Sequence, residues 1–135
     1  MRRITFSLLA LLMVSAMLLV LPLAPRGLAA HPHPVATYDE AVRLVDSLRA
    51  ADGTAVAPEC GTRLFGHGER TARVVVLLHG LTNCPAQCDS LGRLAWARGA
   101  NVLIPRLPHH GLADRMTEDL AHVEARELCA FTDHV

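Results

Sequence analysis

Residues 74–81 read VVVLLHGL, and this stretch decides the fold. Its first five residues form an apolar run of valine and leucine that is too short for a buried helix, so it predicts a strand covered on both faces. His79 and Gly80 end the strand. A glycine at this point lets the chain turn sharply and expose backbone N–H groups, because it has no Cβ. In open α/β sheets, ligands bind at this edge.

The segment after this strand has the pattern of an amphipathic helix. Residues 85–98 begin with Pro85 and stop at Gly99, and their helically spaced apolar positions are Cys88, Leu91, Leu94 and Ala95. Residues 101–104 (NVLI) then predict a second short strand, which Pro105 ends. A strand-helix-strand unit requires a parallel pair of strands, so we expect an α/β fold with helices flanking the sheet.

Two motifs on this unit resemble a known family. Residues 77–82 (LLHGLT) are similar to the His-Gly motif of α/β-hydrolases, and residues 105–111 (PRLPHHG) resemble the P-x-L-P-G-H-G loop of their esterase and lipase-like members. The chain departs from that loop at His109, where the family usually has glycine. The resemblance covers residues 62–135. It implies that residues 60–135 are the amino-terminal part of an α/β-hydrolase domain with a mainly parallel sheet.

The resemblance also implies a reaction, the hydrolysis of a small-molecule carboxylic ester through an acyl-serine and without a cofactor. The backbone N–H of Leu81 would be one of two donors to the oxyanion, and removing such a donor typically costs about 100- to 1000-fold in rate. His79, Gly80 and Thr82 would shape this loop, with His79 orienting it instead of acting as a base. The second motif would supply the cleft-lining residues, which are His109, His110 and Gly111.

The sequence lacks the family's nucleophile elbow, G-x-S-x-G, which strains and exposes the reactive serine. Ser90 stands in residues 88–92 (CDSLG), which lack the first glycine and fall inside the predicted helix. None of the catalytic triad is therefore present. We expect a hydrolase truncated before its triad and inactive as it stands. The alternative is a small non-catalytic exported protein with a binding or structural role, or a gene relic.

The amino terminus has the pattern of an export signal. Two arginines precede the apolar residues 4–24, and the small pair Ala29-Ala30 follows, so residues 1–30 predict a secretory signal peptide and a periplasmic or secreted protein. Cleavage after Ala29 fits the small-x-small rule better than cleavage after Ala30. The alternative is an uncleaved membrane anchor through residues 4–24.

Charge gives no reason to expect a nucleic-acid partner. All 13 basic residues are arginines, and removal of the three in the leader leaves 10 against 13 acidic residues, a net charge near −3. A nucleic-acid surface would need an excess of positive charge.

Residues 31–59 predict an amino-terminal helix and a connector. Residues 37–51 begin with the capping box TYDE and end before Gly53. Residues 61–66 then predict a strand that turns back into the strand at Val74 as an antiparallel hairpin.

The carboxyl-terminal residues predict one more helix. Asp114 and the acidic residues within 117–119 would open it, because acids suit the positive end of the helix dipole. Its core-facing stripe would consist of Leu120, Leu128, Phe131 and Val135.

The four cysteines allow three pairings if the chain is exported. In the predicted hairpin, Cys60 lies opposite the end of the strand at Val74 and close to Cys84, so we favour a disulfide between Cys60 and Cys84. Cys88 and Cys129 lie on helix faces and are expected to remain buried thiols.

Eight histidines raise the question of a metal site. His31 and His33 would lie near the new amino terminus, where an amine and an imidazole can chelate copper, although a flexible leader remnant is the simpler interpretation. His109 and His110 are adjacent and would point in opposite directions on an extended loop, so they cannot easily share one ion. We therefore expect no metal, with copper at His31 and His33 as the alternative.

Overall fold

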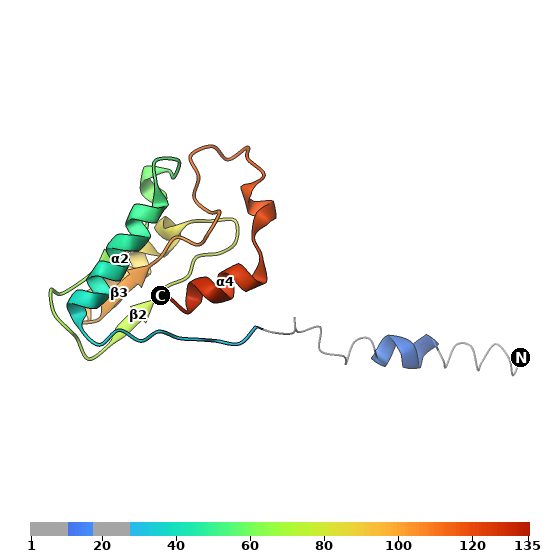
Figure 1. Ribbon diagram of the computed structural model, residues 1–135, viewed down its shortest axis with the longest axis horizontal. Helices are drawn as coiled ribbons and strands as arrows, with labels where there is room; N and C mark the ends of the chain where they lie inside the picture. The colour runs from blue at the N-terminus through green and yellow to red at the C-terminus, as the bar shows by residue number, and fades with distance from the viewer. Residues whose placement is uncertain (1–10, 18–27) are drawn as a thin grey trace, which may run out of the picture.

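Three strands form one mixed sheet in which β3, Asn101–Ile104, is central. β2, Val74–Val76, runs parallel to β3 with Val75 opposite Val102, and β1, Arg63–Phe65, runs antiparallel to it with Leu64 opposite Leu103. The parallel pair joined by a helical crossover confirms the predicted strand-helix-strand unit. The prediction that the Val74 strand is covered on both faces is wrong, because β2 is an edge strand whose Val74 and Val76 are 67% and 40% exposed. The arrangement appears in Figure 1, which shows the computed structural model.

The predicted hairpin between β1 and β2 is wrong, because β3 lies between these two strands. All four residues of β3 are buried, so this strand occupies the centre of the sheet. The connection from β1 to β2 passes the beginning of β3 and is held there by Asn101. The Asn101 side chain accepts from His67 N–H at 2.9 Å and donates to the Glu69 carbonyl at 2.8 Å.

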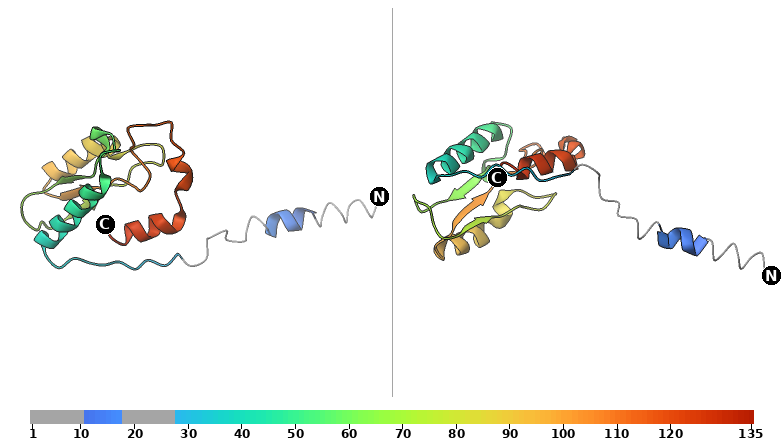
Figure 2. Two further views of the ribbon diagram at one scale, coloured as in Figure 1. Left: turned by 45° about the horizontal axis from the view of Figure 1, so that its top comes forward. Right: turned by 60° about the horizontal axis from the view of Figure 1, so that its bottom comes forward.

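Helices cover both faces of the sheet, giving three layers (Figure 2). On the face of helix α3, Asp89–Ala97, the core contains alternate strand residues, and its members include Phe65, Val75, Val102 and Ile104. On the face of helix α2, Tyr38–Asp52, the buried helix residue is Val45. This division follows from the alternation of side chains along each strand.

The amino-terminal helix α2 confirms the capping prediction. The Thr37 side chain accepts from Glu40 N–H at 3.2 Å, which satisfies one of the free donors of the first turn. The Glu40 carboxylate in turn accepts from Ala36 N–H at 2.9 Å. Gly53 follows the helix with φ 68°, a left-handed conformation that favours glycine.

The crossover helix differs from the prediction in its start and in its buried face. Its first turn is the 3₁₀ helix η2, Pro85–Cys88, and α3 begins at Asp89. Leu91 and Leu94 are 56% and 47% exposed. Gly92 packs on the sheet instead, because a Cβ there would lie 2.9 Å from Ile104 Cδ1. The helix approaches the sheet closely at Gly92, and this turns the two leucines outward.

The carboxyl-terminal prediction of one helix with a buried stripe is wrong. A 3₁₀ turn η3, Asp119–His122, is separated from helix α4, Ala125–Thr132, by extended backbone at Val123 and Glu124. No residue of α4 is buried. The helix therefore lies beside the sheet without entering its core, as Figure 1 also shows.

The structure describes residues 11–17 and 28–135. Most of the predicted signal peptide or membrane anchor lies outside these residues, while residues 11–17 are an exposed helix. Within the described ranges, no helix combines the length and apolar character needed to span a bilayer. A short extra element, 3₁₀ helix η1 at Pro58–Cys60, joins α2 to β1.

Candidate functional site

A cleft of about 200 Å³ lies between the loops that follow β2 and β3. This is the carboxyl-terminal edge of the two parallel strands, where ligands bind in open α/β sheets. Thr82, Asn83 and Cys84 line it from the first loop, and His109, His110 and Gly111 line it from the second. Cys60, at the end of η1, adds a further lining residue. Of the predicted oxyanion-loop residues, Thr82 lines the cleft, and His79, Gly80 and Leu81 precede it in the same loop.

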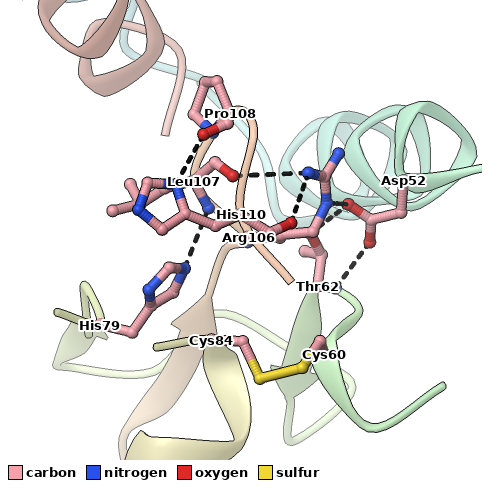
Figure 3. Close-up of polar contacts among 9 residues, drawn as sticks. All are labelled: Asp52, Cys60, Thr62, His79, Cys84, Arg106, Leu107, Pro108 and His110. Carbon is pink, nitrogen blue, oxygen red and sulfur yellow. Dashed lines mark hydrogen bonds and ion pairs between the residues drawn. A yellow bond between two sulfur atoms is a disulfide. The ribbon is translucent and has the colours of Figure 1, made fainter. Parts of the chain in front are cut away.

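His79 is buried and connects the two loops (Figure 3). Its Nε2 accepts from Leu107 N–H at 3.1 Å, so this nitrogen carries no proton. Its Nδ1, 3.0 Å from the Gly80 carbonyl oxygen, is then the protonated nitrogen and donates to it. Burial lowers the pKa of His79, and the nearby His110 and Arg106 lower it further, while the bond to Gly80 acts in the opposite direction. The neutral ring is therefore a fixed bridge between the loops.

The peptide between Gly80 and Leu81 is held from one side. The Gly80 carbonyl accepts from His79 Nδ1 and from Asn83 N–H at 3.0 Å. In a trans peptide the N–H points opposite to the carbonyl, so these two bonds fix the direction of Leu81 N–H. Within the described part of the chain, Leu81 N–H donates to no acceptor.

Gln87 holds the preceding peptide of the same loop. Its side-chain oxygen accepts from Gly80 N–H at 3.0 Å. Gln87 was not among the predicted site residues. Its place two residues after Pro85, in the first turn of the crossover helix, brings it back over the His-Gly turn.

The second loop takes its shape from His109, His110 and Gly111. Gly111 has φ 71°, and a Cβ there would lie 2.8 Å from Cys60 Cβ, so only glycine fits. His110 is almost fully buried and its Nδ1 donates to the Pro108 carbonyl at 2.6 Å, while the ring meets that of His79 edge-on at 5.2 Å between centroids. His109 holds the left-handed φ of 64° at the position where the resembled loop has glycine.

An ion-pair network that was not predicted from the sequence supports the second loop on the side away from the cleft. Arg106 Nε lies 2.7 Å from Asp52 Oδ1, and Arg106 Nη1 donates to the His110 carbonyl at 3.0 Å. The other Asp52 oxygen accepts from Thr62 N–H at 2.6 Å. An acid at the carboxyl end of a helix is disfavoured by the helix dipole, so the position of Asp52 was the available signal.

The predicted disulfide between Cys60 and Cys84 is confirmed. It joins η1 to the end of the first loop, with a Cα–Cα distance of 5.2 Å, and both cysteines line the cleft. Cys88 and Cys129 are free thiols as predicted, but they are half-buried instead of buried.

The histidines near the amino terminus contact the end of α4. His31 N–H donates to the Asp133 carboxylate at 2.8 Å, and the rings of His33 and His134 stack at 5.4 Å. No three potential metal ligands come together among residues 11–17 and 28–135. Copper at His31 and His33 therefore remains a prediction without a formed site.

The serines of the described residues do not form an elbow. Ser15 and Ser47 lie on helices, and Ser90 is exposed in the first turn of α3. None follows a strand directly, so the chemistry available to this site is that of hydrogen-bond donors and acceptors around a cleft.

No family model, curated protein or solved structure matches this chain. The structure itself defines a small mixed α/β domain with a three-stranded sheet and a loop-lined cleft at one edge.

Proposed function

We propose that this chain is the amino-terminal part of an exported serine hydrolase of the α/β-hydrolase class, acting on carboxylic esters. The observation that carries the proposal is the peptide between Gly80 and Leu81, whose carbonyl is held by His79 and Asn83. Within the described residues its N–H has no acceptor, and the next residue, Thr82, lines the cleft.

A fixed donor of this kind suits an oxyanion hole. A donor that is already oriented stabilises the charge that develops in the transition state without a cost of reorganisation at that moment. The role belongs to the backbone of Leu81, because the residue is 62% exposed and its side chain takes no part in the bonds that hold the loop.

The proposal places the nucleophile, the acid and the catalytic histidine in sequence that follows residue 135. The 135 residues contain no G-x-S-x-G, so they supply the oxyanion loop and the cleft wall but not the attacking group. The alternative is a non-catalytic exported protein that uses the same cleft for binding.

Amide NMR of the full 135-residue chain tests the oxyanion donor. Diethyl phosphate, a stable tetrahedral anion, serves as the probe. We expect a saturable shift of the residue-81 amide in the wild type and in Leu81→Ala, which keeps the N–H. In Leu81→Pro, which removes it, the saturable shift of the neighbouring cleft-lining Thr82 amide should be lost. A Leu81 amide that does not respond while other cleft amides do would contradict the assignment.

Export is tested separately by the mass of the product outside the cytoplasm. We propose cleavage after Ala29, which gives a protein that begins at Ala30. A product that starts at Met1 and stays with the membrane fraction would support the anchor instead.

A further inference from the structure

We propose that His109 is a positioning residue that holds the outer wall of the cleft through Glu127 and Asp119. The outer wall is defined here as residues 112–120, of which Leu112, Asp114, Arg115, Thr117 and Leu120 line the cleft. This role rests on the proposed function. In that function, the wall held by His109 would determine which ester groups fit the cleft.

The backbone of His109 is the first observation. Its φ of 64° is unusual for a residue with a side chain, and such outliers persist where the surrounding structure holds them. Gly111, two residues later, is also left-handed, so the loop makes two such turns within three residues. A glycine at 109 would take this conformation without strain, and the imidazole therefore has a use of its own.

The contacts of the imidazole are the second observation. His109 Nε2 lies 3.2 Å from Glu127 Oε2 on α4, and Nδ1 lies 4.0 Å from Asp119 Oδ1 on η3. The His122 ring, also on η3, lies at 6.3 Å between centroids. One side chain of the cleft loop thus reaches both elements that follow the wall.

The weak anchoring of those elements is the third observation. No residue of η3 or α4 is buried, and Leu128, Cys129 and Phe131 of α4 are only half-buried, so apolar packing holds these elements less firmly than it holds the strands of the sheet. At the far end of α4, the amino-terminal segment bonds Asp133 through His31 and His33. His109 is the contact at the cleft end, and its loss would let the wall move away from Thr82 and the disulfide.

Hydrogen exchange of the full chain, followed by NMR, tests this role without any enzymatic activity. The variants are His109→Asn, since asparagine tolerates the left-handed backbone but is too short to reach Glu127, and Glu127→Gln. The matched control is Glu118→Gln, which also removes one negative charge. Glu118 is not one of the carboxylates within 4.0 Å of His109, which are Asp119 and Glu127.

We expect the α4 amides, including that of Leu128, to exchange about two- to fivefold faster in His109→Asn, as fits the loss of a partly exposed polar contact. Glu127→Gln should act in the same direction, and adding it to His109→Asn should have no further effect. The β3 amides and the Glu118→Gln control should match the wild type.

The proposal would be overturned if α4 exchange in His109→Asn equals that of the wild type. It would also be overturned if the acceleration in the double variant is the product of the accelerations in the two single variants. If His109→Asn also accelerates exchange of the β3 amides, it has destabilised the sheet, and Glu127→Gln becomes the deciding variant. The Glu127 side chain is 40% exposed and does not support the sheet. A faster α4 with an unchanged β3 then supports the role, and an unchanged α4 overturns it. If diethyl phosphate does not shift the Leu81 amide while the exchange rates of the variants are as expected, the oxyanion assignment is rejected. The positioning role of His109 is then still supported.

Discussion

His79 Nε2 accepts a hydrogen bond from Leu107 N–H at 3.1 Å, so a single buried imidazole joins the loop after β2 to the loop after β3. The same ring holds the Gly80 carbonyl through Nδ1. The geometry of the cleft edge therefore depends on one neutral histidine, and the first prediction concerns its loss.

His79→Phe should lower the free energy of unfolding by about 1 to 3 kcal/mol, because it leaves the Leu107 N–H buried without an acceptor. His79→Gln should recover part of this loss, since its amide oxygen can occupy the place of Nε2. Urea unfolding of the three proteins measures the difference. If His79→Phe is as stable as the wild type, the hydrogen bond between His79 and Leu107 does not contribute to the free energy of unfolding.

The pH dependence of stability should carry the signature of a buried neutral histidine. The pKa of His79 is lowered from 6.5, chiefly by burial. The unfolded state therefore binds a proton more readily than the folded state. The contribution of His79 is fully present above 6.5 and is lost as the pH falls from there toward the lowered folded pKa.

Urea midpoints at about pH 7.5 and about pH 5.5 check this prediction. The wild type should lose more stability on acidification than His79→Gln, which cannot titrate at this position. Equal losses in the two proteins would assign the pH dependence to other groups.

Breaking the ion pair behind the second loop should be costly. Asp52→Asn should destabilise the fold by about 3 kcal/mol, because Arg106 then keeps its charge without a carboxylate in a largely buried place. The two side chains are only 11% and 13% exposed. Asp46→Asn is the matched control. It breaks an exposed pair with Arg49 within α2 and should cost at most about 0.5 kcal/mol.

Urea unfolding of both aspartate variants gives the comparison. Similar midpoints for the two would show that the buried network does not support the loop.

The disulfide should contribute about 2 to 4 kcal/mol, because it constrains the unfolded chain across a separation of 24 residues. The double variant Cys60→Ser/Cys84→Ser should lose this amount of stability, and reductant should then have no effect on its unfolding. The stability of Cys129→Ser should remain close to that of the wild type. The check is urea unfolding with and without dithiothreitol. A wild type that does not respond to full reduction, verified by thiol counting, would contradict the prediction.

The sequence predicted the elements whose signals are local. The capping box at Thr37, the valine run of β2 and the glycine and proline boundaries of the crossover each act within a few residues, and the structure has them. Strand order could not be predicted in this way, because it depends on contacts between residues that are far apart in the sequence. β1 was expected to pair with its neighbour in sequence, but β3, all four of whose residues are buried, takes the centre. The polar contacts of Asn101 with the connection could not be foreseen from periodicity.

The site could be predicted only in outline. The two loops were placed at one sheet edge from their motifs, and the pairing of Cys60 with Cys84 was correct, although the hairpin used to argue it was not. The bonds of His79 to Leu107 and of Arg106 to Asp52 join residues 28 and 54 positions apart. Such pairs have no pattern in a single sequence. The outward turn of Leu91 and Leu94 likewise depends on how closely Gly92 approaches Ile104.

The most direct test of the account is labelling of the native gene product with a serine-reactive fluorophosphonate, followed by identification of the modified peptide and the intact mass of the protein. The account predicts a labelled serine in a G-x-S-x-G sequence that follows residue 135, in a product heavier than this chain. Mutation of that serine should abolish labelling. A native product of the mass of this chain that is not labelled would contradict a serine hydrolase and favour a non-catalytic binding protein.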